Sequence, residues 1–295
     1  MHRMLLVSFT IALAAIIGPA VVHAQAPAQP TFATTKVEGT DNVYFFRYQG
    51  HQAMFVVTPE GVIATDPISE DRPAAAAYLG EIRKITQAPI RYVVYSHHHP
   101  DHIAGGKPFK DAGAVFVAHR IAKERLAQMN RADIVPVDET VEDKRTLTLG
   151  GTELELVYVG RNHSDNSLVM RLPRQRLLFT VDFIPVASVN FSNMPESYLP
   201  DWDESLKRVI ALDWDRMIPG HPGPGGRLGT KLDVQNLLTY MQELSAEVKK
   251  AADAGKCPDA AKSEIKMPKY ASWTNYDRYL PGNIERYCTY WMKGQ

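Results

Sequence analysis

The run Ser-His-His-His-Pro-Asp-His over residues 96–102 concentrates imidazoles and a carboxylate in a short stretch of chain. His97 and His99 are two residues apart at the end of an apolar, strand-like segment, so their side chains should point to the same side. The proline that follows turns the chain, which lets Asp101 and His102 project toward the same space. Such a cluster is costly to desolvate unless a cation binds it, whereas a lone histidine is more often structural. We therefore predict that these four residues form the core of a metal site.

The segments around this run predict the strands and helices that position it. Residues 91–95 are β-branched and aromatic, which is typical of a strand that leads directly into the histidines. The order is strands followed by helices, twice, with no linker-like segment between, which predicts an α+β fold of two sheets between two helical layers. The predicted strands are 43–48, 53–57, 62–65, 91–95, 114–118, 146–149, 153–159, 167–172 and 176–181, and the predicted helices start near 73 and cover 121–129, 203–212, 233–254 and 283–293.

The first 24 residues have the pattern of a secretory signal peptide. Arg3 precedes an apolar run over residues 5–17, and Val-His-Ala at 22–24 precedes the bond to Gln25. A membrane anchor is the alternative, but the run is shorter than the ~20 residues that a span needs. We predict a signal peptide over residues 1–24, a single domain over residues 25–295, a secreted or periplasmic location and no membrane span after cleavage.

Composition and cysteine count narrow the class of protein further. The chain is 45% hydrophobic and 22% charged, which is typical of a globular protein. Without residues 1–24 it is nearly neutral and has no basic cluster, so nothing supports nucleic-acid binding. Cys257 and Cys288 both lie near the C-terminus. In an exported protein we expect them to form a disulfide, with two buried thiols as the alternative.

The pattern His-x-His-x-Asp-His after an apolar strand resembles that of the metallo-β-lactamase superfamily. The resemblance covers nearly the whole mature chain, from the early hairpins, which include Thr-Asp-Pro at 65–67, to Pro-Gly-His at 219–221 late in the sequence. It implies a four-layer αβ/βα sandwich with two sheets between helical layers. It also implies two metal ions whose ligands are His97, His99 and His163 for the first, Asp101, His102 and His221 for the second, and Asp182 as a bridge between both.

Three of these ligands depend on the resemblance rather than on spacing. His163 follows the strand over residues 153–159, and His221 follows Pro-Gly; either one is otherwise a plain loop histidine. Asp182 stands where many members have a bridging aspartate, but the usual preceding glycine is Val181 here. The alternative for Asp182 is a carboxylate that supports a ligand or caps a segment.

The ligand set that the resemblance implies indicates a hydrolytic chemistry. Five histidines and two carboxylates suit two zinc ions per chain, although iron or manganese uses the same donors. Two metal ions about 3.5–4 Å apart can share a bridging hydroxide that acts as the nucleophile at neutral pH. Asp101 is the expected catalytic residue because it would bind metal, orient that hydroxide and carry a proton to the leaving group.

The implied reaction is hydrolysis of a small-molecule ester, lactone, thioester or amide. A bridging aspartate is similar to that of glyoxalase II-like thioesterases, lactonases, phosphodiesterases and alkylsulfatases, whereas the β-lactamases typically have cysteine or serine there. The alternatives are β-lactam hydrolysis, phosphodiester or sulfate ester hydrolysis, and an iron-dependent oxidoreductase that resembles persulfide dioxygenases. A non-catalytic metal-binding protein is a further alternative.

Five other features lie near the predicted site. His98 should point away from its neighbours and is predicted not to be a ligand. Asp66 is either a partner of a ligand histidine or a turn-forming residue before proline. His51 lies in a hairpin tip that would cover the cleft as a flap, and His119 either lines the edge of the site or starts a helix. The loop over residues 184–202 either shapes the substrate pocket or packs on the surface.

Overall fold

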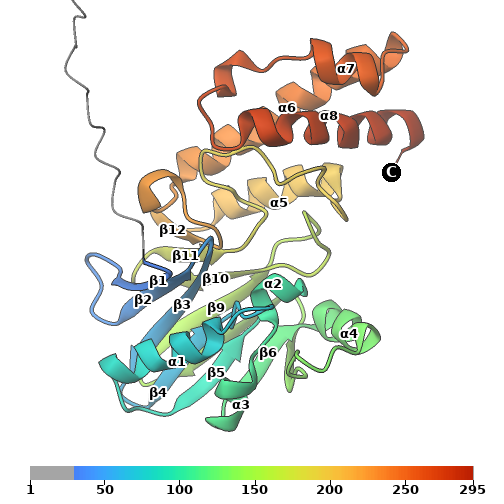
Figure 1. Cartoon of the computed structure of the whole chain (residues 1–295). Coiled ribbons are helices and arrows are strands. Elements are labelled where there is room, and N and C mark those ends of the chain that lie inside the picture. The colour runs from blue at the N-terminus through green and yellow to red at the C-terminus, as the bar shows by residue number, and fades with distance from the viewer. Residues whose placement is uncertain (1–29, 295) are drawn as a thin grey trace, which may run out of the picture. The chain divides into compact units, whose positions relative to one another are not determined.

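The computed structural model describes residues 30–294, so the predicted signal peptide over residues 1–24 lies outside the described residues. From residue 31 onward the chain forms one compact unit. Two sheets provide its framework, and helices lie on their outer faces (Figure 1).

The first sheet has seven strands that follow one another in chain order. β1 to β4 pair antiparallel, whereas β4 to β7 pair in parallel because helices connect them. The strands are β1 (Phe32–Lys36), β2 (Val43–Tyr48), β3 (His51–Thr58), β4 (Gly61–Thr65), β5 (Ile90–Val94), β6 (Val115–His119) and β7 (Glu139–Val141).

The second sheet has five strands in the order β12-β11-β10-β9-β8. Gly150 and Gly151, with φ of 51° and 76°, make the predicted β8–β9 turn, in which both residues need a left-handed backbone. β11 and β12 pair in parallel, so their C-terminal ends lie at the same edge of the sheet. The strands are β8 (Lys144–Leu149), β9 (Thr152–Tyr158), β10 (Leu168–Leu172), β11 (Leu177–Thr180) and β12 (Arg216–Pro219).

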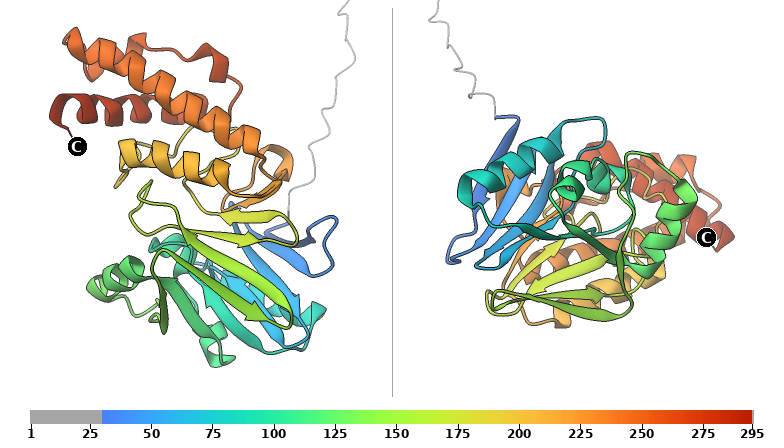
Figure 2. Two further views of the ribbon diagram at one scale, coloured as in Figure 1. Left: turned by 180° about the vertical axis from the view of Figure 1, so that it is seen from behind. Right: turned by 90° about the horizontal axis from the view of Figure 1, so that it is seen from below.

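Helices cover both outer faces of the pair of sheets. α1, α3 and α4 lie against the first sheet, and α5 and α6 lie on the far side of the second, as the views in Figure 1 and Figure 2 show. The helices are α1 (Ala74–Ile85), α2 (Pro100–Ile103), α3 (Lys107–Asp111), α4 (Arg120–Met129), α5 (Leu199–Ala211), α6 (Lys231–Asp253), α7 (Asp259–Glu264) and α8 (Tyr276–Lys293).

Three apolar cores fill the spaces between the four layers. Along β3, Phe55 packs into the core under α1 while its neighbour Met54 packs into the core between the sheets. Along β10, Met170 packs between the sheets and Val169 packs under α5 and α6. Successive strand residues point to opposite faces, so strands that are buried on both faces are apolar at consecutive positions. This layering confirms the predicted αβ/βα sandwich.

The C-terminal helices carry the two cysteines. Cys257, between α6 and α7, forms a disulfide with Cys288 in α8, which confirms the predicted bond. Gly282 lies in α8 where a side chain would meet the backbone oxygen of Ser192 at 2.6 Å, so a glycine is required for α8 to pack against the loop after β11. Within residues 30–294 no helix has the length and hydropathy that crossing a membrane requires.

Some elements differ from the predictions. β1, β7, β12, α2 and α7 were not predicted, because each is too short to show a clear apolar pattern. α5 starts at Leu199, with Pro200 in its first turn, so Asp203 lies inside the helix and does not cap it. The Asp203 carboxylate instead accepts a hydrogen bond from Gln242 of α6 at 3.2 Å.

Candidate metal centre

The segment after β5 carries the predicted ligands of the histidine-rich run. The backbone amide of Ser96 donates to the Asp66 carboxylate at 2.7 Å, and the Ser96 carbonyl accepts from Leu168 at 2.7 Å. These two bonds attach the segment to the end of β4 and to the start of β10, which places His97 between the sheets. His99 then precedes α2, whose first residue is a proline, and Asp101 lies in the first turn of that helix.

The other predicted ligands lie in loops at the same edge of the sheets. His163 follows β9, Asp182 follows β11 and His221 follows β12. Asp182 has a φ of 66°, a left-handed conformation that aspartate adopts more readily than most residues. The structure therefore brings all seven predicted ligands together, although their binding of metal stays a prediction.

Asp182 lies between two groups of nitrogen donors. Its Oδ2 is 3.3 Å from His97 Nε2, 3.5 Å from His163 Nε2 and 3.9 Å from His99 Nδ1; we call these three histidines the first ligand group. Its Oδ1 is 3.0 Å from His102 Nε2 and 2.9 Å from His221 Nε2; with Asp101 these form the second ligand group. One carboxylate thus presents one oxygen to each group, which is the arrangement expected of a bridging ligand.

Partners on the far side of the rings orient three of the histidines. His221 Nδ1 donates to the carbonyl oxygen of Gly50 at 2.6 Å, and His163 Nδ1 lies 3.2 Å from the amide oxygen of Asn162. A ring that donates through Nδ1 presents the lone pair of Nε2, here toward Asp182. His99 is turned the other way, because its Nε2 donates to Glu196 at 3.1 Å and its Nδ1 faces Asp182.

Buried polar atoms at the centre fit a bound metal. Among the described residues, His97 Nε2, His102 Nε2, His163 Nε2 and Asp182 Oδ1 are buried and satisfy no hydrogen-bond geometry. Buried polar groups normally have partners, so four such atoms in one place call for a cation. Groups of imidazole and carboxylate donors on both sides of a shared carboxylate fit two ions of the zinc type.

Burial and neighbouring charges shift the pKa values of these groups in different directions. Burial lowers the pKa of His97 well below its usual value, and it lowers the pKa of His163, so both rings are neutral donors at pH 7. Burial alone would lower the pKa of His102, but Asp182 and Asp101 raise it to about 9. Burial would likewise raise the pKa of Asp182, yet His102 and His221 keep it well below its usual value, so the carboxylate is ionised.

The remaining predicted residues have supporting positions. Asp66 is buried and binds the Ser96 amide, so it fixes the turn into the ligands. His98 Nδ1 accepts from Asn166 at 2.8 Å, which directs the ring away from Asp182. His119 starts α4, where its Nδ1 accepts from the amide of Ile121 at 3.3 Å, so the helix-start alternative is correct.

Two residues near the centre were not predicted in their observed positions. His51 was expected in a flap, but its Nε2 lies 3.2 Å from Asp101 Oδ2, and burial lowers its pKa to about 4. Glu196, which binds His99, lies in the long loop before α5 and was not predicted at all. Neither residue has a sequence neighbour in the centre, so only the tertiary fold could have revealed them.

Comparisons with known proteins show which family this sequence resembles. The family model described as the metallo-beta-lactamase superfamily matches residues 49–221, which is more than half of the chain. The chain is 25% identical over 199 residues to the 2,4-dinitroanisole O-demethylase subunit alpha of Nocardioides sp. (strain JS1661), covering 65% of this chain and 58% of that protein. It therefore spans little more than half the length of that relative. It is 26% identical over 188 residues to a metallo-beta-lactamase type 2 of Bacillus sp. (strain 170), covering 61% of this chain and 70% of that one.

A solved structure shows the same fold. The metallo-beta-lactamase from Pontibacter korlensis superposes with a TM-score of 0.63 at 21% identity, over 72% of this chain and 99% of that one. This likeness concerns the fold alone, whereas the family model extends from the β2–β3 turn to His221 and so includes all seven predicted ligands. The chain belongs to the metallo-beta-lactamase superfamily, a group of metal-dependent hydrolases, as the histidine-rich run predicts.

Proposed function

We propose that this protein is an exported dinuclear zinc hydrolase that cleaves an ester, lactone, thioester or amide bond of a small molecule. The observation that carries the proposal is the position of Asp182, which presents Oδ1 to the second ligand group and Oδ2 to the first. Zinc ions bound on both sides of this carboxylate would activate water at neutral pH and polarise the bond to be cleaved.

The two ligand groups have different exposure, which supports distinct tasks. The side chains of His97 and His163 are 0% and 11% exposed, whereas those of Asp101 and His221 are 40% and 46% exposed. Substrate therefore approaches the centre from the side of the second group. Asp101 is the carboxylate on that side, so the carboxylate oxygen that does not bind metal would accept a proton and pass it to the leaving group.

Asp182 favours acyl hydrolysis over β-lactam hydrolysis. A hard carboxylate stands at a position where the family resemblance places cysteine or serine in the antibiotic-degrading members. Similarity to a metallo-beta-lactamase type 2 supports β-lactam hydrolysis as the second candidate. The substrate panel described below distinguishes the two candidates.

The disulfide between Cys257 and Cys288 supports export, since such bonds persist in oxidising compartments. Cell fractionation followed by N-terminal sequencing of the mature protein tests this part of the proposal. We expect a periplasmic or secreted chain that starts at Gln25. An intact Met1 on a cytoplasmic protein would contradict it.

Substrate panels on metal-loaded mature protein test the reaction. The panel contains chromogenic esters, a lactone, a thioester, an amide, a β-lactam, a sulfate ester and a phosphodiester, each with and without chelator. We expect two zinc ions per chain and chelator-sensitive turnover of at least one acyl substrate. A single iron ion per chain with no hydrolysis would instead support the oxidoreductase alternative.

A further inference from the structure

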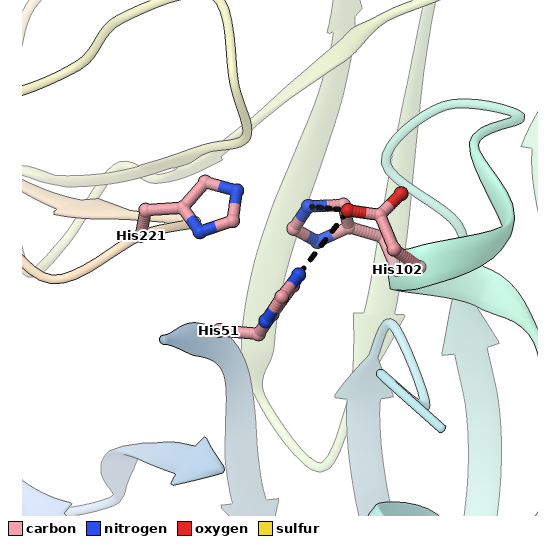
Figure 3. A group of neighbouring side chains, drawn as sticks. His51, His102 and His221 are labelled. Atoms are coloured by element: carbon pink, nitrogen blue, oxygen red, sulfur yellow. Dashed lines mark hydrogen bonds and ion pairs between the residues drawn. The ribbon is translucent and has the colours of Figure 1, made fainter. Parts of the chain in front are cut away.

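The β2–β3 turn places one more imidazole beside the second ligand group. His51 begins β3, and its Nε2 lies 3.2 Å from Asp101 Oδ2. One donor atom from each of His51, Asp101, His102 and His221 falls within 4.8 Å of the others. Figure 3 shows the rings of His51, His102 and His221 converging from three separate segments.

We propose that His51 is a ligand of the second metal ion, together with Asp101, His102 and His221. This inference rests on the proposed dinuclear centre and adds an eighth ligand to it. Each metal ion would then have three imidazoles of its own, and Asp182 would lie between them.

The geometry of the first ligand group supports this assignment. In that group the ring centroids are 4.4, 4.7 and 5.0 Å apart. The rings of His51, His102 and His221 are 4.6, 5.0 and 5.1 Å apart, so they repeat the same triangular arrangement. A hydrogen bond between His51 and Asp101 alone would not require the two other rings to lie at these distances.

The separations of donor atoms are also those of ligands on a common ion. Donors that share a zinc ion at zinc-to-ligand distances of about 2.0–2.1 Å lie about 2.8–3.5 Å apart. Asp101 Oδ2 is 3.2 Å from His51 Nε2 and 3.5 Å from His102 Nε2.

Backbone contacts fix the turn that carries His51, so it is not a free flap. The amide of Gln52 donates to the carbonyl of Gly220 at 2.7 Å, and the Gln52 side chain donates to Pro219 at 2.7 Å. The carbonyl of Gly50 accepts from the ring of His221 at 2.6 Å. The turn that carries His51 and the loop that carries His221 therefore hold each other in place, and both rings lie in the second ligand group.

Zinc titration of the metal-free, full mature chain tests the proposal. His51→Phe retains a ring without a donor, His51→Gln retains a hydrogen-bond donor to Asp101, and His51→Cys supplies a thiolate that binds zinc. We expect His51→Phe and His51→Gln to weaken the affinity for the second zinc ion by about 100-fold or more. The loss of a residue that only supports a ligand costs about 10–100-fold in metal affinity. His51→Cys should restore most of that affinity, and the first zinc should be unaffected in all three.

The control is Gln49→Asn, an exposed side chain of the same turn with a φ of 51° that asparagine tolerates. We expect it to bind both zinc ions as the unmodified protein does. If His51→Gln also binds the second zinc normally, His51 only positions Asp101 and the proposal is wrong. If the unmodified protein binds fewer than two zinc ions, the dinuclear function itself fails.

Cadmium substitution gives a readout that a structural role would not change. Scalar coupling between NMR-active cadmium and imidazole protons passes only through a metal–nitrogen bond. We expect the cadmium ion in the second position to couple to three histidine rings, one of which disappears in His51→Phe. Coupling to only two rings in the unmodified protein would overturn the assignment.

Discussion

The two ligand groups on either side of Asp182 are built in different ways. The first consists of His97, His99 and His163, whose side chains are mostly buried. The second extends to solvent through Asp101 and His221, and hydrogen bonds from the β2–β3 turn secure it. The difference is what the proposed function requires, namely an enclosed metal position beside an open one at which substrate would arrive.

Asp182→Asn removes the feature that the two groups share, so we expect it to have the largest effect. The loss of a charge next to five imidazoles should weaken both zinc ions and lower turnover by at least about 1,000-fold, as several kcal/mol of electrostatic stabilisation are lost. Metal analysis and kinetics measure the change. Asp233→Asn is the control, because this buried carboxylate caps α6 and pairs with Arg227, away from the centre. Retention of both zinc ions in Asp182→Asn would show that the aspartate is no bridge.

Asp101→Ala tests whether the two ligand groups bind their metal ions independently. We expect the first zinc to remain bound, the second to be weakened, and turnover to fall by orders of magnitude because the proton carrier is also lost. Stepwise zinc titration with parallel kinetics distinguishes the two ions. Unchanged activity would refute the site, and equal loss of both ions would show that the groups are not independent.

Glu196→Gln tests the first group through its orienting partner. His99 Nε2 donates to this carboxylate at 3.1 Å, and the Glu196 side chain is about half exposed. We expect the first zinc to weaken by about tenfold, the low end of the range for such partners, with no change in the second. Competition with a chelating dye measures both affinities, and the exposed Glu204→Gln serves as the control. If only the affinity for the second zinc ion fell, the assignment of His99 to the first ligand group would be wrong.

Gln52→Ala should have the smallest effect and concerns the second group. It removes the side-chain bond to Pro219 and leaves a buried carbonyl without that donor. We expect about 1–3 kcal/mol less stability in denaturant unfolding of the metal-free protein, and a few-fold weaker second zinc. A stronger effect on the first zinc than on the second would contradict the docking of the turn to the His221 loop.

The contrast between the groups also explains what the sequence could predict. His97, His99, Asp101 and His102 lie in one short run, so their spacing alone indicates a metal site. His163, Asp182 and His221 each follow a strand, and only the family resemblance assigned them. The four layers could be predicted because strands buried on both faces have continuous apolar runs.

His51 and Glu196 could not be predicted as parts of the centre, for a physical reason. His51 reaches Asp101 because Gln52 and Gly50 bind the loop that carries His221, and these contacts join residues about 170 positions apart. Glu196 lies in a loop without helical or strand periodicity and has a φ of 61°. Short exposed strands such as β1 are also difficult to predict, because an edge strand has little apolar pattern.

Anomalous diffraction from crystals of the zinc-loaded mature protein tests the central claim most directly. Two zinc peaks about 3.5–4 Å apart are expected, one on each side of Asp182, with the first among His97, His99 and His163 and the second among Asp101, His102 and His221. A single peak, or two peaks that do not share Asp182, would contradict the bridged dinuclear centre.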